Sequence, residues 1–256
     1  MDESIQSEDT AELDLSGVSP PLRVVACAAR TDRGTRRRGN EDAVLVAAPL
    51  VAVADGVGGH RAGEEASAVA IDVLRRRVEG FGDAPEQALR SGLQQANDAV
   101  RAAAQVVGRE GMATTLVAAL IGPAALSVAH VGDSRAYLLH GETLMQLTDD
   151  HTRVSALVAE GGLDAGAART HPMRSVILRA VGLEAVLRPD VTTVPACADD
   201  VLLLCSDGLS GFLSPEELGR LVRGEHDLDR LVEELADAAR RAGSGDDVTV
   251  VAARLG

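Results

Sequence analysis

The sequence predicts an α+β domain with strands in its middle and helix pairs outside. Apolar runs that meet an aspartate next to a glycine occur in both halves of the chain, at Asp55, Asp133, Asp207 and Asp246. Segments with apolar residues at helical spacing come in two pairs, which flank a stretch of short, partly β-branched segments. If these aspartates share one site, early and late strands lie together, and the two halves belong to one domain.

Composition places the chain among globular proteins and limits its partners. It has 256 residues, of which 46% are hydrophobic, 25% charged and only 1% aromatic, so Ala, Val and Leu must fill the core. The formal net charge is -14. Nucleic acid is therefore not an expected partner, because a phosphate backbone needs a basic face.

The three cysteines predict free thiols in a reducing cytoplasm. Cys27, Cys197 and Cys205 are too few for a disulfide framework. A zinc site at Cys197 and Cys205 is not favoured, because no two cysteines are close in sequence. No apolar run has membrane-spanning length, and the Met-Asp-Glu-Ser start lacks the features of a secretory signal. We expect a cytoplasmic monomer without membrane contact.

The N-terminal part divides into a leader and the start of the domain. Residues 1–21 are acidic, serine-rich and aperiodic, which predicts a disordered leader that ends at Pro20-Pro21. The domain is expected to cover residues 22–256. It begins with an apolar strand, continues through a dense polar loop over residues 31–42, and returns to strand character before Pro49.

The helices and strands follow from periodicity and from local end signals. Apolar residues at helical spacing mark the helices, and Ser214-Pro215-Glu216-Glu217 is a capping box. The predicted helices cover residues 61–78, 84–107, 154–159, 214–222 and 227–243. The predicted strands cover residues 22–29, 43–47, 51–55, 114–121, 125–131, 135–139, 143–147, 191–194, 201–204 and 248–252. Residues 114–147 are predicted to form a β-meander, and residues 161–174 an exposed flap.

The four strand-end aspartates favour a metal site. Each one alone is better explained as a turn signal, because Asp-Gly is common where a strand ends. Four together, with few other acidic residues inside apolar runs, favour a shared site. Carboxylates held on rigid elements are the ligands that magnesium and manganese require.

An ordered set of motifs identifies a family. The motifs are Arg37, Asn40-Glu41-Asp42, Asp55-Gly56-Val57-Gly58-Gly59-His60, Gly111-Met112-Ala113-Thr114-Thr115, Val131-Gly132-Asp133-Ser134-Arg135, Asp207-Gly208 and Gly243-Ser244-Gly245-Asp246. From about residue 22 onward, the chain resembles the metal-dependent Ser/Thr protein phosphatases of type 2C, in their bacterial form. The resemblance implies a four-layer αββα sandwich, with two central antiparallel sheets flanked by helix pairs.

The resemblance also implies residue roles. Asp55 resembles the carboxylate that bridges two manganese or magnesium ions, and Gly56 a carbonyl ligand. Asp207 and Asp246 are similar to further ligands of the pair, and Glu41 to a residue that reaches the metals through water. Asp133 is similar to a ligand of a third, weaker ion that it shares with Asp207. Arg37 matches the residue that grips the substrate phosphate, and Asp42, Asp247 and His60 are expected beside the ligands.

The chemistry of these residues fits phosphate ester hydrolysis. Two metal ions can clamp the phosphate and lower the pKa of a water that attacks in line with the leaving oxygen. A guanidinium offers paired donors to phosphate oxygens. The expected substrates are proteins phosphorylated by a Ser/Thr kinase.

The chain departs from the family pattern at a few positions. Val57 stands where many eukaryotic members have a histidine that is proposed as the general acid. His60 is as well explained by a helix start as by that role. Asp247 stands where the family usually has asparagine, and its extra charge would alter the surroundings of Asp246.

Two other functions remain open at this stage. The chain could bind phosphoproteins without hydrolysing them, although its complete set of aspartates argues against lost metal binding. It could also act on a small phosphomonoester. His151 and His171 flank the predicted flap and are left out of the site, because loop histidines are more often bystanders than catalysts.

Overall fold

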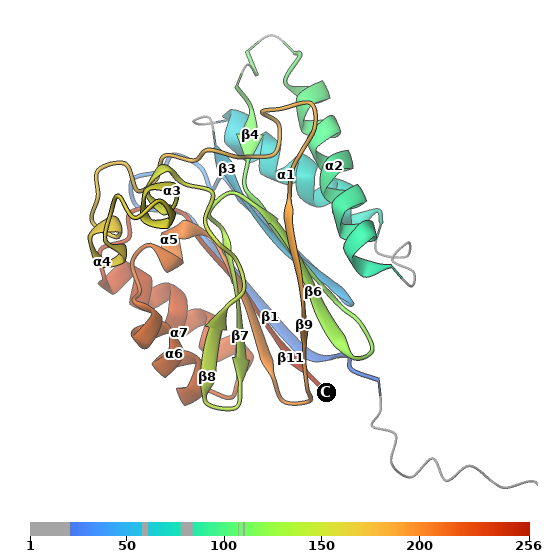
Figure 1. Ribbon diagram of the computed structural model, residues 1–256, viewed down its shortest axis with the longest axis vertical. Helices are drawn as coiled ribbons and strands as arrows, with labels where there is room; N and C mark the ends of the chain where they lie inside the picture. The colour runs from blue at the N-terminus through green and yellow to red at the C-terminus, as the bar shows by residue number, and fades with distance from the viewer. Residues whose placement is uncertain (1–20, 58–60, 78–83, 107, 110) are drawn as a thin grey trace, which may run out of the picture.

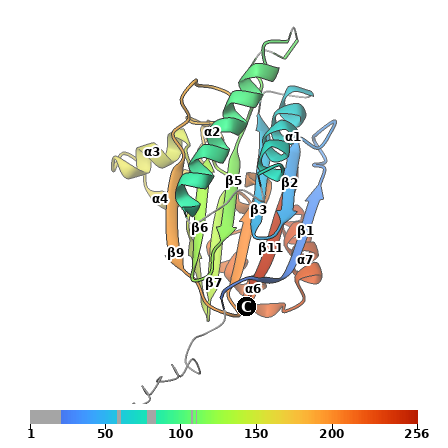
Figure 2. The same ribbon diagram turned by 90° about the vertical axis from the view of Figure 1, so that its right-hand side faces the viewer.

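Two antiparallel sheets pack face to face, with helices on both outer sides. The computed structural model describes residues 21–57, 61–77, 84–106, 108–109 and 111–256. Figures 1 and 2 show α1 and α2 outside one sheet, and α6 and α7 outside the other. The predicted αββα order of layers is confirmed. Residues 1–20 of the predicted leader lie outside the described residues.

The first sheet has the strand order β1-β11-β10-β7-β8. Its strands are β1 (Val24–Asp32), β7 (Arg135–His140), β8 (Thr143–Gln146), β10 (Val201–Cys205) and β11 (Val248–Leu255). The last strand in sequence, β11, lies between β1 and β10 and pairs with both in antiparallel register. The N-terminal and C-terminal parts of the chain are therefore neighbours in one sheet.

The second sheet has the strand order β2-β3-β5-β6-β9, and β4 pairs with β3 beside this path. Its strands are β2 (Asp42–Ala47), β3 (Leu50–Val57), β4 (Ala113–Thr114), β5 (Leu116–Ile121), β6 (Ala125–Val131) and β9 (Asp190–Pro195). Each neighbouring pair on this path is antiparallel.

The helices lie on the outer faces and at the ends of the sheets. They are α1 (Arg61–Arg75), α2 (Pro85–Ala103), α3 (Arg153–Ala159), α4 (Ala165–Ala168), α5 (Asp207–Ser210), α6 (Pro215–Gly224) and α7 (Leu228–Arg241). The capping box at Ser214 starts α6. Asp227 caps α7 by accepting the backbone N–H groups of Asp229 and Arg230. No helix in the described part of the chain is long and apolar enough to cross a bilayer.

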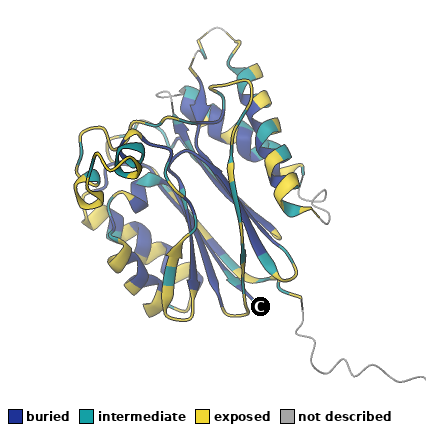
Figure 3. Ribbon diagram, viewed as in Figure 1, coloured by how far each residue is buried: buried dark blue, intermediate teal, exposed yellow. Residues whose placement is uncertain are grey.

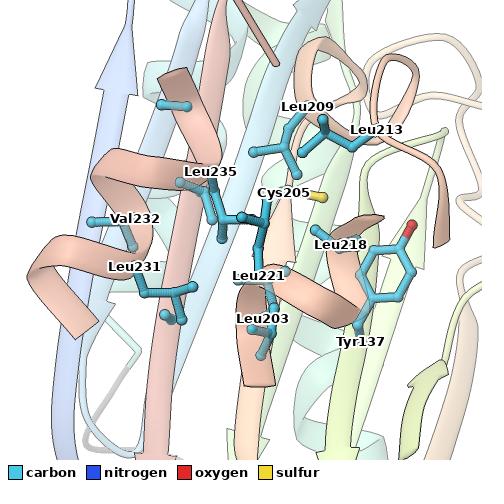
Figure 4. Packing of buried hydrophobic residues seen from close by; sticks show 14 of the residues in the cluster. Tyr137, Leu203, Cys205, Leu209, Leu213, Leu218, Leu221, Leu231, Val232 and Leu235 are labelled. Atoms are coloured by element: carbon cyan, nitrogen blue, oxygen red, sulfur yellow. The ribbon is translucent and has the colours of Figure 1, made fainter. Parts of the chain in front are cut away.

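Alternate residues of the central strands face different layers, because side chains of a strand alternate between its two sides. In β3, Val51 and Val53 pack between the sheets, whereas Ala52 and Ala54 pack against the helices. Figure 3 shows this burial along the central strands. Figure 4 shows the outer layer where Leu231 and Leu235 of α7 and Leu218 of α6 join the cluster of Leu203 in β10. Three apolar layers thus hold the sandwich together.

The β-meander predicted for residues 114–147 is wrong. β5 and β6 pair in one sheet, whereas β7 and β8 pair in the other, and the turn at Gly132 carries the chain across. The strands β5 and β6 are buried along almost their whole length. They therefore lack the polar–apolar alternation that would have revealed two separate sheets. The short helix α5, which begins at Asp207, was also not predicted.

Candidate metal centre

Asp42 and Asp55 face each other across the β2–β3 pair. They are register partners in this antiparallel ladder. Like charges directly opposite each other in a sheet destabilise it, so this pair needs a compensating interaction. Oδ2 of Asp42 accepts the hydroxyl of Ser206 at 2.9 Å. Oδ1 of Asp42 is buried, and it has no hydrogen-bond partner among the described residues.

Asp207 and Asp246 approach Asp55 from the other sheet. Asp207 is the first residue of α5, directly after β10, and Asp246 lies just before β11. The charges of Asp42, Asp133, Asp207 and Asp246 all act on Asp55. We call these five residues, Asp55 included, the acidic cluster. The structure therefore brings together the four strand-end aspartates that the sequence places far apart, with Asp42 beside them.

Several carboxyl groups of the acidic cluster have raised pKa values, so they ionise less readily than isolated aspartates. Burial, and then the neighbouring carboxylates, raise the pKa of Asp55 well above its usual value. Burial and the charge of Asp246 raise the pKa of Asp207. Burial raises the pKa of Asp133 to about 8, with a further contribution from Asp207. These shifts have one sign because burial disfavours the ionised form of each carboxyl group, and the neighbouring carboxylates add to this effect.

This arrangement fits a divalent cation. The donors are carboxylate oxygens, which magnesium and manganese prefer, and buried like charges are stabilised by an ion of opposite charge. The unpartnered buried oxygen of Asp42 is a further sign that the cluster is not closed by protein hydrogen bonds. The residues present therefore suit the two-ion centre that the motifs imply.

Gly56 and Gly63 let two backbone segments meet beside the cluster. A Cβ atom on Gly56 would lie 2.3 Å from the carbonyl oxygen of Gly63, and one on Gly63 would lie 2.6 Å from Oε2 of Glu41. Only glycine permits this approach. Glu41 is buried, and its carbonyl accepts the Gly56 N–H at 3.1 Å. His60, predicted beside the ligands, lies outside the described residues.

Arg37 is held next to the cluster by two carboxylates. Its Nε donates to Oδ1 of Asp246 at 2.6 Å, and one terminal nitrogen lies 3.5 Å from Oε2 of Glu41. The hydrogen bond to Asp246 is the largest cause that raises the pKa of Arg37. Arg37, Asp133, Asp207 and Asp246 line one cavity of about 970 Å³. The predicted phosphate-binding residue and three predicted metal ligands therefore share a cavity.

Asp133 is placed by hydrogen bonds between the two sheets. The hydroxyl groups of Ser134 and Thr115 lie 2.7 Å apart, and the Thr115 hydroxyl accepts the backbone N–H of Asp55 at 3.0 Å. Arg135 donates two hydrogen bonds, both 2.7 Å long, to Asp150. The turn that carries Asp133 is thereby fixed to β3 and to the segment before α3.

His151 is a positioning residue that the sequence argument left out. Its Nδ1 accepts the backbone N–H of Gly132, and its Nε2 donates to Asp190 at 3.1 Å. Its ring stacks on His130 at a centroid distance of 4.6 Å. In the sequence, the only signal for this role of His151 is its place in the polar run Asp149-Asp150-His151-Thr152 next to α3. His171, which is half-buried, accepts a local hydrogen bond from the backbone N–H of Met173 instead.

Asp247, which replaces the usual asparagine, supports the loop that carries Arg37. Its Oδ1 accepts the N–H of Gly34 at 2.7 Å, and its Oδ2 accepts the N–H of Glu41 at 2.8 Å. It is 3% exposed. Asp247 thus ties the segment after β1 to the start of β11, directly beside Asp246.

Comparison with known proteins gives consistent results. The family model described as "Protein phosphatase 2C" matches residues 35–251. The serine/threonine phosphatase stp of Listeria welshimeri is 37% identical over an alignment of 233 residues, and the match covers 87% of this chain and 92% of that protein. The crystal structure of the Mycobacterium tuberculosis serine/threonine phosphatase PstP/Ppp superimposes with a TM-score of 0.85 at 40% identity. It covers 91% of this chain and 98% of that one.

A further structure is the catalytic domain of serine threonine protein phosphatase PstP in complex with two manganese ions. Its TM-score is 0.84 at 38% identity, with 91% of this chain and 99% of that chain covered.

Proposed function

The chain belongs to the protein phosphatase 2C family, and we propose that the acidic cluster and Arg37 form the site where it hydrolyses phosphoserine and phosphothreonine in proteins. It is a metal-dependent Ser/Thr protein phosphatase. The observation that carries the assignment of the site is the cavity that Arg37 shares with Asp133, Asp207 and Asp246. No Cys nucleophile or Ser-His-Asp triad is required, because the cluster suits metal-assisted attack by water.

Two manganese or magnesium ions are assigned to the cluster. Asp55, the Gly56 carbonyl, Asp207 and Asp246 would hold them, and Glu41 would act through water. When bound, such ions neutralise charge on the phosphate and lower the pKa of a water molecule between them. The mutual repulsion of the carboxylates supports this assignment. So does the 38% identical PstP catalytic domain, whose structure contains two manganese ions.

A third, more weakly held ion is assigned to Asp133 and Asp207. The charge of Asp207 acts on Asp133, which indicates that the two carboxylates are near each other. Asp133 sits in the turn between the sheets, whereas Asp55 lies within β3. In this assignment Asp55 belongs to the pair of ions and is not a ligand of the third ion.

The protein's own groups orient the phosphate. Arg37 is fixed by Asp246, so its remaining donors can face the cavity with little loss of side-chain entropy on binding. Asp42 and Asp247 hold the surrounding segments through Ser206, Gly34 and Glu41. These contacts keep the cluster in one geometry before substrate arrives.

The substrates are phosphoproteins, and we expect them to be products of a Ser/Thr kinase. Arginines on the cavity rim give it a positive edge on a chain whose formal net charge is -14: Arg36, Arg169 and Arg174. Such an edge attracts phosphorylated segments. The catalytic domain is assigned to residues 22–256, because the Leu22 N–H donates to Pro123 and Arg23 pairs with Gly256 through the backbone. A monomer is expected.

Hydrolysis of a phosphothreonine peptide during a manganese titration tests the proposal. Chelator-treated protein should be inactive, and manganese or magnesium should restore turnover. Asp55→Asn should remain inactive at every metal concentration, whereas Asp237→Asn on exposed α7 should match the wild type. Full activity without metal would overturn the mechanism. Binding without hydrolysis would identify a phosphoprotein-binding module, and preference for a small phosphomonoester would identify a metabolic phosphatase.

A further inference from the structure

A histidine, a cysteine and an aspartate meet at the end of the sandwich opposite the acidic cluster. β10 begins after Asp200 and ends just before Asp207, so the two ends are roughly 20 Å apart along the strand. Figure 1 shows the end of the β7–β8 hairpin and the β9–β10 turn at the lower edge of the molecule. An imidazole nitrogen of His140, Sγ of Cys197 and a carboxylate oxygen of Asp200 all lie within 4.8 Å of one another.

The backbone fixes Cys197 and Asp200 relative to each other. The Cys197 N–H donates to Oδ2 of Asp200 at 2.9 Å, and the Asp200 N–H donates to the Cys197 carbonyl at 3.3 Å. Asp199 between them has a φ of 70°, in the left-handed region. The end of β11 anchors this turn, because Leu255 exchanges backbone hydrogen bonds with Asp199 and Asp200. Two of the three groups are therefore held on a defined turn rather than on a loose loop.

His140 completes the group from a neighbouring strand. Leu139 pairs with Val201, which places His140 next to Asp200. Nδ1 of His140 lies 2.9 Å from Oδ1 of Asp200. Two ligands of a tetrahedral zinc ion are roughly 3.3 Å apart, given bonds of about 2.0–2.2 Å. The side chain of His140 is 58% exposed and Cys197 is exposed, so both can make the small movements that a metal requires.

We propose that His140, Cys197 and Asp200 bind a zinc ion, separate from the ions of the acidic cluster. The thiol of Cys197 loses its proton on binding, and the ion takes the place of the hydrogen bond between His140 and Asp200. Imidazole, thiolate and carboxylate together suit zinc, whereas a cluster of oxygens alone suits magnesium or manganese. An adjoining cavity of about 490 Å³, lined in part by His140, Asp200 and His226, leaves the fourth position accessible to water.

Zinc at this position would add a metal link between two segments that already meet through the pairing of Leu139 with Val201 and the hydrogen bond between His140 and Asp200. It would tie the end of β7 to the turn between β9 and β10. The role is structural and does not depend on the phosphatase reaction. It also differs from a Cys197–Cys205 site, because Cys205 lies buried at the other end of β10.

A second group of possible metal ligands is not expected to bind zinc. His130, His151 and Asp190 also lie within 4.8 Å of one another. Both ring nitrogens of His151 already bind protein groups, Gly132 and Asp190, and Arg179 pairs with Asp190. That group is closed by its own hydrogen bonds, so it serves to position the turn that carries Asp133.

The other two cysteines provide internal controls. Burial raises the pKa of the Cys27 thiol to about 11 and that of the Cys205 thiol to about 12. Neither thiol loses its proton readily, so neither is expected to bind a metal. A thiolate–metal signal from this protein would therefore come from Cys197.

Cobalt(II) titration of the chelator-treated full chain tests the proposal directly. A thiolate bound to cobalt gives a near-ultraviolet charge-transfer band, whereas cobalt in the acidic cluster has no sulfur ligand and gives none. The wild type should develop this band to the intensity of one thiolate-bound cobalt per chain, and excess zinc should remove it. Cys27→Ser should behave like the wild type. Cys197→Ser should lack the band, and His140→Gln should bind cobalt at least ten-fold more weakly, as judged from the same band.

Three results would overturn the proposal. The first is the absence of a thiolate band in the wild-type protein, which requires no variant. The second is a band that persists in Cys197→Ser or disappears in Cys27→Ser. The third is a cobalt band that persists in a large excess of zinc. None of these readouts uses phosphatase activity, so the zinc site and the proposed catalytic site can fail independently.

Discussion

Oδ2 of Asp247 accepts the backbone N–H of Glu41 at 2.8 Å, while its Oδ1 accepts that of Gly34 at 2.7 Å. One buried side chain thereby holds both ends of the loop that presents Arg37. Both hydrogen bonds need an acceptor atom in the side chain of residue 247. A carboxylate has two acceptor oxygens, whereas an asparagine amide has one acceptor oxygen and one donor nitrogen. The two hydrogen bonds therefore explain why an aspartate suits this position, apart from its charge.

Asp247→Asn should loosen this loop. An asparagine amide nitrogen would face one of the two N–H donors, so one buried bond would be lost at a cost of about 1–3 kcal/mol. We expect a lower free energy of unfolding in urea and a several-fold higher Michaelis constant for a phosphopeptide. Asp237→Asn, on the exposed side of α7, is the control. An unchanged Michaelis constant together with unchanged stability would contradict the role.

Arg37→Ala should impair substrate binding more than metal binding. Arg37 lies on the cavity and contacts Asp246 at 2.6 Å, so its loss removes phosphate donors and also a positive neighbour of a ligand. The Michaelis constant should rise roughly ten-fold or more, in line with the loss of a charge-assisted bond. Manganese affinity, measured by calorimetry, should not fall, because removing a cation does not disfavour another. Arg38→Ala is the neighbouring control, and a collapse of metal affinity in Arg37→Ala would refute the assignment.

Asp133→Asn should lower the turnover rate without removing the two tightly bound metal ions. Asp55 is assigned to the central pair of ions, and Asp133 to a third ion at the turn between the sheets. The variant should keep two tightly bound ions and lose most of its turnover on a phosphopeptide. Metal analysis and steady-state kinetics on the same sample check both parts. Loss of one of the two tight ions, or wild-type turnover, would return Asp133 to the role of a turn residue.

His151 should make the metal-free protein sensitive to mild acid. Burial lowers its pKa to about 4, from about 6.5 in an unfolded chain. Between these values the unfolded state binds a proton that the folded state does not, so the free energy of unfolding falls as the pH falls. The full effect is about 3 kcal/mol at 1.36 kcal/mol per unit.

His151→Gln should remove this part of the pH dependence. Urea unfolding near pH 7 and near pH 4.5, with a chelator present, measures the slope in the wild type and in the variant. His171→Gln, which changes a loop histidine outside the contacts of His151, should keep the wild-type slope. Equal slopes in the wild type and His151→Gln would show that His151 does not resist protonation in the fold.

Local sequence signals predicted the elements well, because their causes are local. Ser214 and Asp227 cap their helices through groups within three residues, and Thr152 caps α3 in the same way. The meeting of Asp55, Asp133, Asp207 and Asp246 was also predictable, since buried carboxylates at strand ends have few stable arrangements without a common cation.

The relationships that escaped prediction are long-range. The division of residues 114–147 between two sheets depends on which buried face of each strand meets which layer. Fully apolar strands lack the polar–apolar alternation that would indicate this. The partners of His151 lie 19 and 39 residues away, at Gly132 and Asp190. Cys197 meets His140 rather than Cys205, because strand register, not spacing along the chain, brings them together.

The position of β11 between β1 and β10 imposes an order on biosynthesis. Until residues 248–255 have been translated and have left the ribosome, β1 and β10 have no strand to join them, and Asp246 has no rigid support. A chain in which β11 has not yet paired therefore has the other carboxylates of the acidic cluster without a fixed position for Asp246. We expect such a chain to be inactive toward phosphoproteins until residues 248–255 have joined the sheet.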